Sequence, residues 1–171
     1  RTLSVIEGKD TFNLSDKNKL TAGFEYRKDQ SEGTRLKKPN TSLADGNAHD
    51  AYDKAAINYL AAYVQDEFRP DDKWLIIPSV RFDHSDQFSN KLTSNLAATY
   101  NAADDVRIKA AIGQGYKTPT VNDLYIFWGM YDANPGGKGQ FYVCNPDLKP
   151  EKSLSYELSV EKDWGDRSTV H

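Results

Sequence analysis

The 171-residue sequence contains a single cysteine, Cys144, so it cannot form an internal disulfide. No apolar run approaches the roughly 18 residues that a membrane-spanning helix requires. The 22 basic residues are outnumbered by 25 acidic residues, giving a formal net charge of −3. These absences exclude a disulfide scaffold and a helical membrane protein, and they leave no basic surface for a nucleic-acid partner.

Aromatic residues are abundant instead, with ten tyrosines, three tryptophans and seven phenylalanines. β-Sheet surfaces collect such side chains. Apolar and polar residues alternate with a period of two along much of the chain, which indicates strands. The alternation predicts an all-β antiparallel fold with strands at residues 1–12, 19–29, 56–69, 73–84, 91–101, 106–117 and 153–164. Residues 1–12 alternate least clearly.

Alternation alone fits a soluble β-sandwich or lipocalin-like barrel as well as a transmembrane β-barrel. Two features favour the transmembrane barrel. The strands are about 10–14 residues long, which is enough to cross a bilayer at a tilt. The polar face is charged along much of its length, as expected for the wall of a water-filled lumen. The predicted lumen-facing residues are Glu25, Arg27, Gln65, Glu67, Arg81, Asp83, Arg107, Lys109, Glu157 and Glu161.

The positions of aromatic residues on the apolar face also favour a transmembrane barrel. They lie at strand ends, with aliphatic residues between them. One set of ends carries Phe68, Trp74, Tyr100 and Trp164, and the opposite set carries Tyr26, Phe82, Tyr116 and Tyr156. Two aromatic girdles around an aliphatic band are typical of two membrane–water interfaces.

The connections between the predicted strands alternate in length. Those at 15–18, 70–72 and 101–105 are short, whereas those at 30–55, 85–90 and 118–152 are longer. Outer-membrane barrels have short periplasmic turns and long extracellular loops. We therefore expect the longer connections to face outward, and a loop as long as 118–152 is expected to be functional.

Five stretches resemble the barrel of TonB-dependent outer-membrane receptors. They are LTAGFEYRKD (20–29), AAYVQDEFRP (61–70), IPSVRFDHS (77–85), IKAAIGQGYKTPTVNDLY (108–125) and NPDLKPEKSLSYELSVE (145–161). The most specific feature is the YKTP…NPDLKPE pair. The motif residues are Tyr116, Pro119, Leu124, Asn145, Pro146, Leu148, Pro150 and Glu151.

The resemblance implies that residues 1–171 are part of a barrel domain of about 22 strands, and we expect the segment to be stable only within that barrel. No plug domain and no energy-coupling TonB box are recognisable, and the chain ends in His171 rather than a terminal aromatic residue. The expected partners are outer-membrane lipid, an iron chelate or similar small molecule, the plug and the TonB energy-coupling protein.

The resemblance also implies a multi-pass protein of the cell outer membrane that performs energy-coupled uptake, with no catalytic residues and no cofactor. A ferric siderophore is the first candidate ligand, followed by cobalamin and haem. Haem ranks last because haem receptors of this family typically carry a histidine in the loop between the two motifs, and residues 119–144 contain none. A soluble β-sandwich or barrel binding module and a passive porin are the alternatives from other classes.

The candidate ligand-binding residues are the aromatic residues of the long loop together with nearby cations and histidines. They are Lys117, Tyr125, Phe127, Trp128, Tyr131, Phe141, Tyr142, His49 and His84. Aromatic rings can stack on a flat ligand, and lysines can neutralise its negative charge. The alternative is that the rings pack the loop on itself or extend the outer girdle.

The remaining motifs give little indication of a catalytic or metal site. GQGYKT (113–118) lacks the phosphate-loop spacing, so its glycines are expected to leave room on the lumen face. Arg81 and Asp83 share a face and predict an ion pair. An outer loop carries weak calcium candidates, although no metal site is expected there; they are Asp45, Asn47, Asp50 and Asp53. Cys144 has no cysteine or histidine partner and is expected to do no chemistry.

Overall fold

The computed structural model describes residues 1–33, 53–130, 140–164 and 169–170. Most of them form one antiparallel sheet in the order β1-β2-β3-β4-β5-β6-β9-β10. Its strands are β1 (Thr2–Asn13), β2 (Asn18–Gly33), β3 (Asp53–Phe68), β4 (Trp74–Ser85), β5 (Lys91–Ala103), β6 (Val106–Lys117), β9 (Glu151–Asp163) and β10 (Thr169–Val170). All seven predicted strands are confirmed, and β10 is an additional short one.

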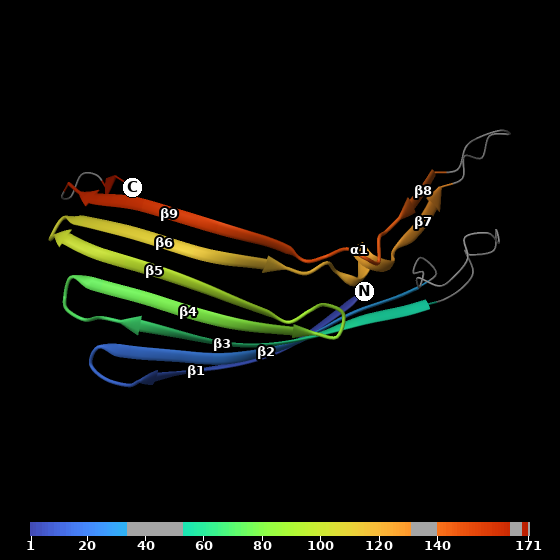
Figure 1. Ribbon diagram of the computed structural model, residues 1–171, viewed down its shortest axis with the longest axis horizontal. Coiled ribbons are helices and arrows are strands. Elements are labelled where there is room, and N and C mark those ends of the chain that lie inside the picture. Colours follow the sequence, from blue (N-terminus) through green and yellow to red (C-terminus); the bar gives the residue numbers. More distant parts are fainter. Residues whose placement is uncertain (34–52, 131–139, 165–168, 171) are drawn as a thin grey trace.

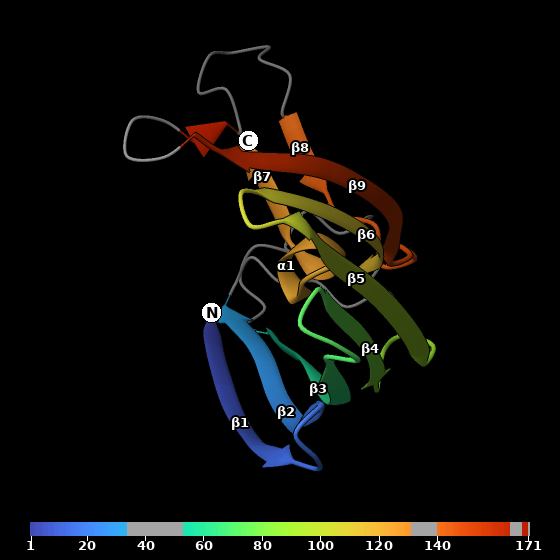
Figure 2. The same ribbon diagram turned by 90° about the vertical axis from the view of Figure 1, so that its left-hand side faces the viewer.

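The sheet is curved and open. Neighbouring strands lie side by side in chain order, and the sheet bends around one side to form a trough (Figures 1 and 2). β1 and β10 are its two edges. An open edge leaves backbone N–H and C=O groups unpaired, which a lipid environment does not tolerate. The shape is therefore that of a section of a larger closed barrel.

The register separates two faces. On the inner face, Ala61 of β3 lies between Glu25 of β2 and Asp83 of β4. On the outward face, Leu60 lies between Tyr26 and His84. Large apolar side chains are exposed all along the outward face; examples are Phe24, Leu60, Val64, Val80, Leu92, Leu96, Ile112, Leu154, Leu158 and Val160. The predicted assignment of apolar residues to the outward face is confirmed, and it contradicts a soluble sandwich, whose apolar face would be covered.

Aromatic side chains lie at both ends of the outward face, as predicted. At one end Trp74 of β4 stacks on Tyr100 of β5, with ring centroids 4.6 Å apart. Near the other end Phe24 lies over Gly8, where a Cβ atom would come within 2.7 Å of the ring. An aromatic ring covering a cross-strand glycine shields the backbone there.

The sheet has a turn end and a loop end. The turn end holds the short connections 14–17, 69–73 and 104–105, and the loop end holds 34–52, 86–90 and 118–150. The connection predicted at 118–152 spans residues 118–150 and carries secondary structure of its own. It contains α1 (Val121–Tyr125) and a separate hairpin of β7 (Phe127–Met130) and β8 (Gln140–Val143). The connection predicted at 30–55 is also shorter, because β2 and β3 extend further.

Fully buried large side chains are few among the described residues and lie at the loop end. Ile57 of β3 packs with Val121 and Leu124 of α1, and Phe88 and Tyr125 border this cluster. Within the part of the chain that the structure describes, no helix is long and apolar enough to cross a membrane. Because the small core lies between β3 and α1, it fixes the helix against the sheet and does not hold the sheet itself together.

Candidate functional site

A hollow of about 560 Å³ lies on the inner face near the loop end. Its lining comes from β1 to β6, together with Arg1, Ser89, Thr118 and Thr120, so the curvature of the sheet creates it. Four predicted lumen residues line it, namely Glu25, Arg27, Arg81 and Asp83. Side chains of both charges therefore meet in one cavity, which is open to polar ligands or to another polar protein surface.

The guanidinium of Arg81 joins two strands that are not neighbours. Its Nε lies 3.0 Å from Asp83 Oδ1, and its Nη2 lies 3.4 Å from Glu25 Oε2 across β3. Ala61 is the β3 residue between the two carboxylates, and its small side chain is buried. A larger residue there would occupy the path of the arginine. The predicted ion pair between Arg81 and Asp83 is confirmed, and Glu25 is its third member.

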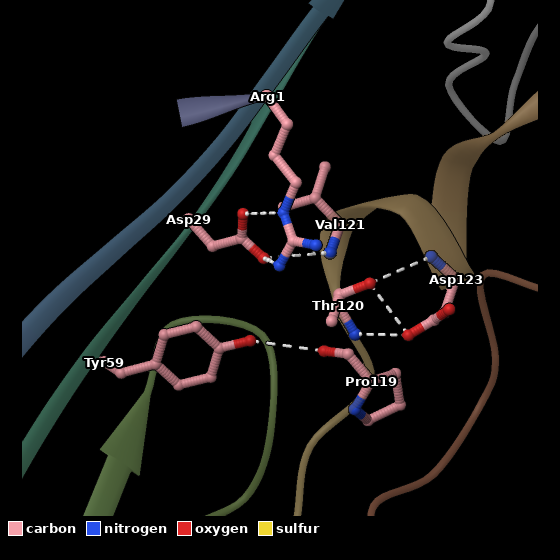
Figure 3. A network of polar contacts seen from close by, with 7 residues as sticks. All are labelled: Arg1, Asp29, Tyr59, Pro119, Thr120, Val121 and Asp123. Carbon is pink, nitrogen blue, oxygen red and sulfur yellow. Dashed lines mark hydrogen bonds and ion pairs between the residues drawn. The ribbon is translucent and has the colours of Figure 1, made fainter. Parts of the chain in front are cut away.

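Tyr59 connects the wall to the long loop. Its ring lies under the guanidinium of Arg27, whose Cζ is 4.2 Å from the ring centroid. Its hydroxyl donates a hydrogen bond to the carbonyl oxygen of Pro119, at 3.2 Å (Figure 3). Pro119 of the family motif is thereby held against β3 through its backbone.

The helix α1 begins at a capping box. The Thr120 hydroxyl accepts a hydrogen bond from the Asp123 N–H, and the Asp123 carboxylate accepts one from the Thr120 N–H at 2.8 Å (Figure 3). This reciprocal pair satisfies two backbone donors that a helix start leaves open. The Thr120 N–H and the Thr120 hydroxyl both donate to the Asp123 carboxylate, and these hydrogen bonds hold the pKa of Asp123 below its ordinary value, with Lys117 and Arg1 adding smaller electrostatic contributions.

A buried carboxylate ties α1 to the sheet. Asp29 of β2 accepts hydrogen bonds from Nε and Nη2 of Arg1, both at 2.8 Å, and its Oδ2 also accepts one from the Val121 N–H at 3.4 Å (Figure 3). The bidentate geometry is the strongest form of such a pair. We call Arg1, Asp29, Tyr59 and residues 119–123 the anchor.

A second charged network lies on the inner face toward the turn end. Glu161 of β9 pairs with both Arg107 and Lys109 of β6. Glu67 pairs with Arg69 at 3.3 Å and with Lys19 at 3.9 Å. Gln65 lies on the same face of β3 as Glu67, and Glu157 lies exposed on β9. The predicted lumen residues therefore form two groups, one in the hollow and one near the turns.

The predicted ligand-binding residues are only partly brought together. Tyr125 ends α1 and packs half-buried beside the Ile57 cluster, while Lys117 is exposed and 3.8 Å from Glu151. In the hairpin, Trp128 pairs in register with Tyr142, Phe141 with Gly129 and Phe127 with Val143. Tyr131 and His49 lie outside the described residues.

His84 is among the residues that line the 560 Å³ hollow, whereas the calcium candidates form no described site. His84 lies on the outward face beside Leu60, and its Nδ1 is 2.7 Å from Asn90 Oδ1. Asp53 begins β3, and the other three candidates, Asp45, Asn47 and Asp50, lie outside the described residues. No group of three metal-ligating side chains occurs within the described part of the chain.

The motif residues hold the long connection at both of its ends. Leu124 is buried in the small core, and the Tyr116 hydroxyl donates to the Ser89 carbonyl at 3.4 Å. Asn145 closes a turn through its side chain and backbone, accepting from the N–H groups of Asp147 and Leu148. Pro146 lies inside this turn, and Pro150 directly precedes Glu151, where β9 begins. Because their rings fix φ, these prolines stiffen the entry to the strand, and β9 starts two residues earlier than the strand predicted at 153–164.

The two glycines of the GQGYKT run, Gly113 and Gly115, make room for side chains of the neighbouring strands. A Cβ atom on Gly113 would lie 2.7 Å from Asn95 Oδ1, and one on Gly115 would collide with the hydroxyl of Ser153. The vacant volume on the lumen face is thus filled by side chains of neighbouring strands. A plug or a backbone approach is not required to explain either glycine.

The anchor was missed at the sequence level. Asp29 shares the alternating face of Glu25 and Arg27, so period two could have placed it on the wall. The spacing of Thr120 and Asp123 is that of a capping box and could have indicated the start of a helix. The contact of Arg1 with Asp29 spans 28 residues and has no local signal.

The family model described as TonB dependent receptor-like, beta-barrel, matches residues 3–170. A vitamin B12 transporter from Photobacterium profundum is 31% identical, over 92% of this chain and 21% of the relative. The ferrienterobactin receptor of Escherichia coli is 30% identical, over 83% of this chain and 20% of the relative. The chain thus spans about a fifth of the length of the curated relatives that it matches.

Solved structures give the same fold. A ferric enterobactin receptor from Pseudomonas aeruginosa superposes with a TM-score of 0.75 at 19% identity, covering 95% of this chain and 24% of the receptor. The siderophore receptor PirA from the same organism superposes with a TM-score of 0.74 at 20% identity, covering 94% and 29%. At these identities the likeness concerns the fold alone.

Proposed function

Since the chain belongs to the TonB-dependent receptor-like β-barrel family, we propose that it forms part of the wall and outer surface of an energy-coupled importer of a ferric siderophore. The sheet is a section of an outer-membrane β-barrel. Its loop end faces the outside, where the chelate binds, and its turn end faces the periplasm. The plug that fills the lumen and the segment that contacts TonB belong to other parts of the same receptor.

The observation that carries this proposal is the anchor. It holds an aromatic hairpin at the loop end, beside a charged hollow on the inner face. Aromatic rings with nearby cations suit a planar, anionic iron chelate. Uptake involves no covalent chemistry on the ligand, because the work required is binding, release and passage. The known relatives named above are transport receptors.

Cobalamin is the second candidate ligand, because the Photobacterium profundum relative is a vitamin B12 transporter. Growth assays distinguish the two candidates. Cells lacking the receptor are supplied with a ferric catecholate siderophore, with cobalamin or with haem as the limiting nutrient, with and without the restored gene. We expect growth to depend on the receptor only for the siderophore. If growth depended on the receptor only with cobalamin, cobalamin would be the ligand. If growth were the same with and without the receptor on all three nutrients, the proposed uptake function would be refuted.

A paired variant tests whether the hairpin contributes. Trp128→Ala with Tyr142→Ala in the full-length receptor is expected to weaken siderophore binding by about tenfold, the sum of two lost aromatic contacts. Trp164→Ala removes an exposed aromatic side chain at the turn end and serves as the matched control. Equal affinities of the two variants, measured by titration in detergent, would remove the hairpin from the binding site.

A further inference from the structure

A second groove lies at the loop end, between the β4–β5 connection and the stretch that leads into β9. It has a volume of about 630 Å³ and is lined by residues 87–91 and 146–150, with Tyr116 and Lys152. Three of its lining residues are lysines, Lys91, Lys149 and Lys152, whereas Asp147 is its single acidic residue. The groove is therefore cationic in a protein whose formal net charge is negative.

Two of these lysines, Lys149 and Lys152, differ from three lysines of strands β6 and β9. Lys109, Lys117 and Lys162 each lie within 4.0 Å of a carboxylate. Lys149 and Lys152 are exposed, and no ion pair joins either of them to another described residue. Their charges are thus available to an anion from outside the chain.

The groove continues directly into the outward apolar face. Lys152 shares that face of β9 with Leu154 and Tyr156, which are 53% and 73% exposed. Leu92 of β5, 59% exposed, adjoins the groove lysine Lys91 in the chain. Lysine stems can lie along apolar surface while the ammonium group reaches the aqueous boundary. Cationic side chains therefore stand where the lipid headgroups meet the aromatic girdle.

We propose that this groove binds a phosphorylated headgroup of an outer-leaflet lipid. Lys149 and Lys152 hold the phosphate by charge-assisted hydrogen bonds, and the acyl chains lie against Leu154 and Leu92. The proposal is independent of the imported ligand, because Lys152 and Leu154 face away from the lumen. A phosphate joined to hydrocarbon matches both the lysines and the adjoining apolar face.

The test uses the full-length receptor carrying Lys149→Glu and Lys152→Glu. The receptor is incubated with phosphatidylcholine vesicles that contain a minority of diphosphorylated lipid A, re-isolated in detergent, and its bound lipid is counted by native mass spectrometry. We expect the double variant to retain roughly tenfold less lipid A or lower still, since each basic residue near such a surface contributes to the attraction. Lys17→Glu with Lys73→Glu changes the same charge at the turn end and should retain as much lipid A as the wild type.

A second pair, Lys149→Gln with Lys152→Gln, removes the charges without introducing repulsion and covers the case in which the glutamate variant does not assemble. Its lipid A retention should fall by several-fold, and the monophosphorylated lipid should bind the wild type more weakly than the diphosphorylated one. Wild-type retention in the glutamine variant would overturn the proposal. Full displacement of lipid A by inorganic phosphate at matched ionic strength would also overturn it, because the site would then recognise a free anion rather than a lipid.

Discussion

On β9, Leu158 and Glu157 are neighbours in the chain and face different surroundings. Leu158 is 75% exposed on the outward face, whereas Glu157 points to the inner face beside Ala111. Throughout the sheet the outward face exposes large apolar side chains, and the inner face holds charges that pair across strands. In a soluble protein, so many exposed apolar side chains would indicate a face that has lost its packing partner. The contrast shows instead that the two faces meet different solvents, lipid outside and water inside.

The largest expected effect comes from placing a charge on the outward face. Leu158→Arg in the full-length receptor should abolish assembly, since an arginine near the bilayer midplane costs about 2–4 kcal/mol. Glu157→Arg is the matched control, with the same new residue one position away on the inner face, and it should assemble. Heat-modifiable mobility of the receptor from outer-membrane fractions measures both. Normal assembly of Leu158→Arg would mean that this position does not face lipid.

On the inner face, the next effect comes from removing the buried carboxylate of the anchor. Asp29→Ala leaves Arg1 and the Val121 N–H without their partner, at a cost of about 1–3 kcal/mol. Hydrogen exchange of the Leu124 and Ile126 amides, which bond within α1, should accelerate, while exchange in β3 and β4 should not change.

The control for the anchor is Glu7→Ala, which removes an exposed carboxylate from the inner face of β1. It touches no residue of α1 and should leave the exchange of peptide 118–126 at the wild-type rate. Equal protection of that peptide in the Asp29 and Glu7 variants would show that the anchor does not hold the helix.

Two neighbouring alanines of β3, Ala61 on the inner face and Ala62 on the outward face, allow the two faces to be compared within one strand. Ala61→Leu should reduce the free energy of unfolding by about 1–3 kcal/mol, because the larger side chain competes with the Arg81 guanidinium for the same space. Ala62→Leu adds the same atoms on the outward face, where lipid accommodates them, and should be neutral. Urea titration of the receptor in bilayers compares the two, and equal losses would contradict the assigned faces.

The smallest effect concerns pH. Because the folded pKa of Asp123 lies below its ordinary value, its contribution to stability is present above that value of 3.8 and is lost as pH falls through the lower, folded pKa. Amide protection of α1 should therefore weaken only in strongly acidic solution. Asp123→Asn should flatten this dependence and change little at neutral pH. A dependence centred near neutral pH would assign it to another group.

Period two was sufficient to predict the long strands, the outward apolar face and the girdles, because each depends on residues close in sequence. It could also place Arg81 beside Asp83, two residues away. The link from Arg81 to Glu25 could not be predicted, since it depends on the register of three strands. The anchor is still less local, because Val121 and Asp29 are 92 residues apart and meet only when the sheet curves.

The position of α1 has a mechanical consequence. The helix follows β6 in the chain but rests on β2 and β3, so it bridges the arc over β4 and β5 (Figure 2). A helix that links two separate parts of a curved sheet fixes the distance between them. A pull on the β7–β8 hairpin is therefore borne by strands β2 and β3 as well as by those that carry the connection. Five residues of helix thus connect, at the outer rim, strands that lie on either side of β4 and β5.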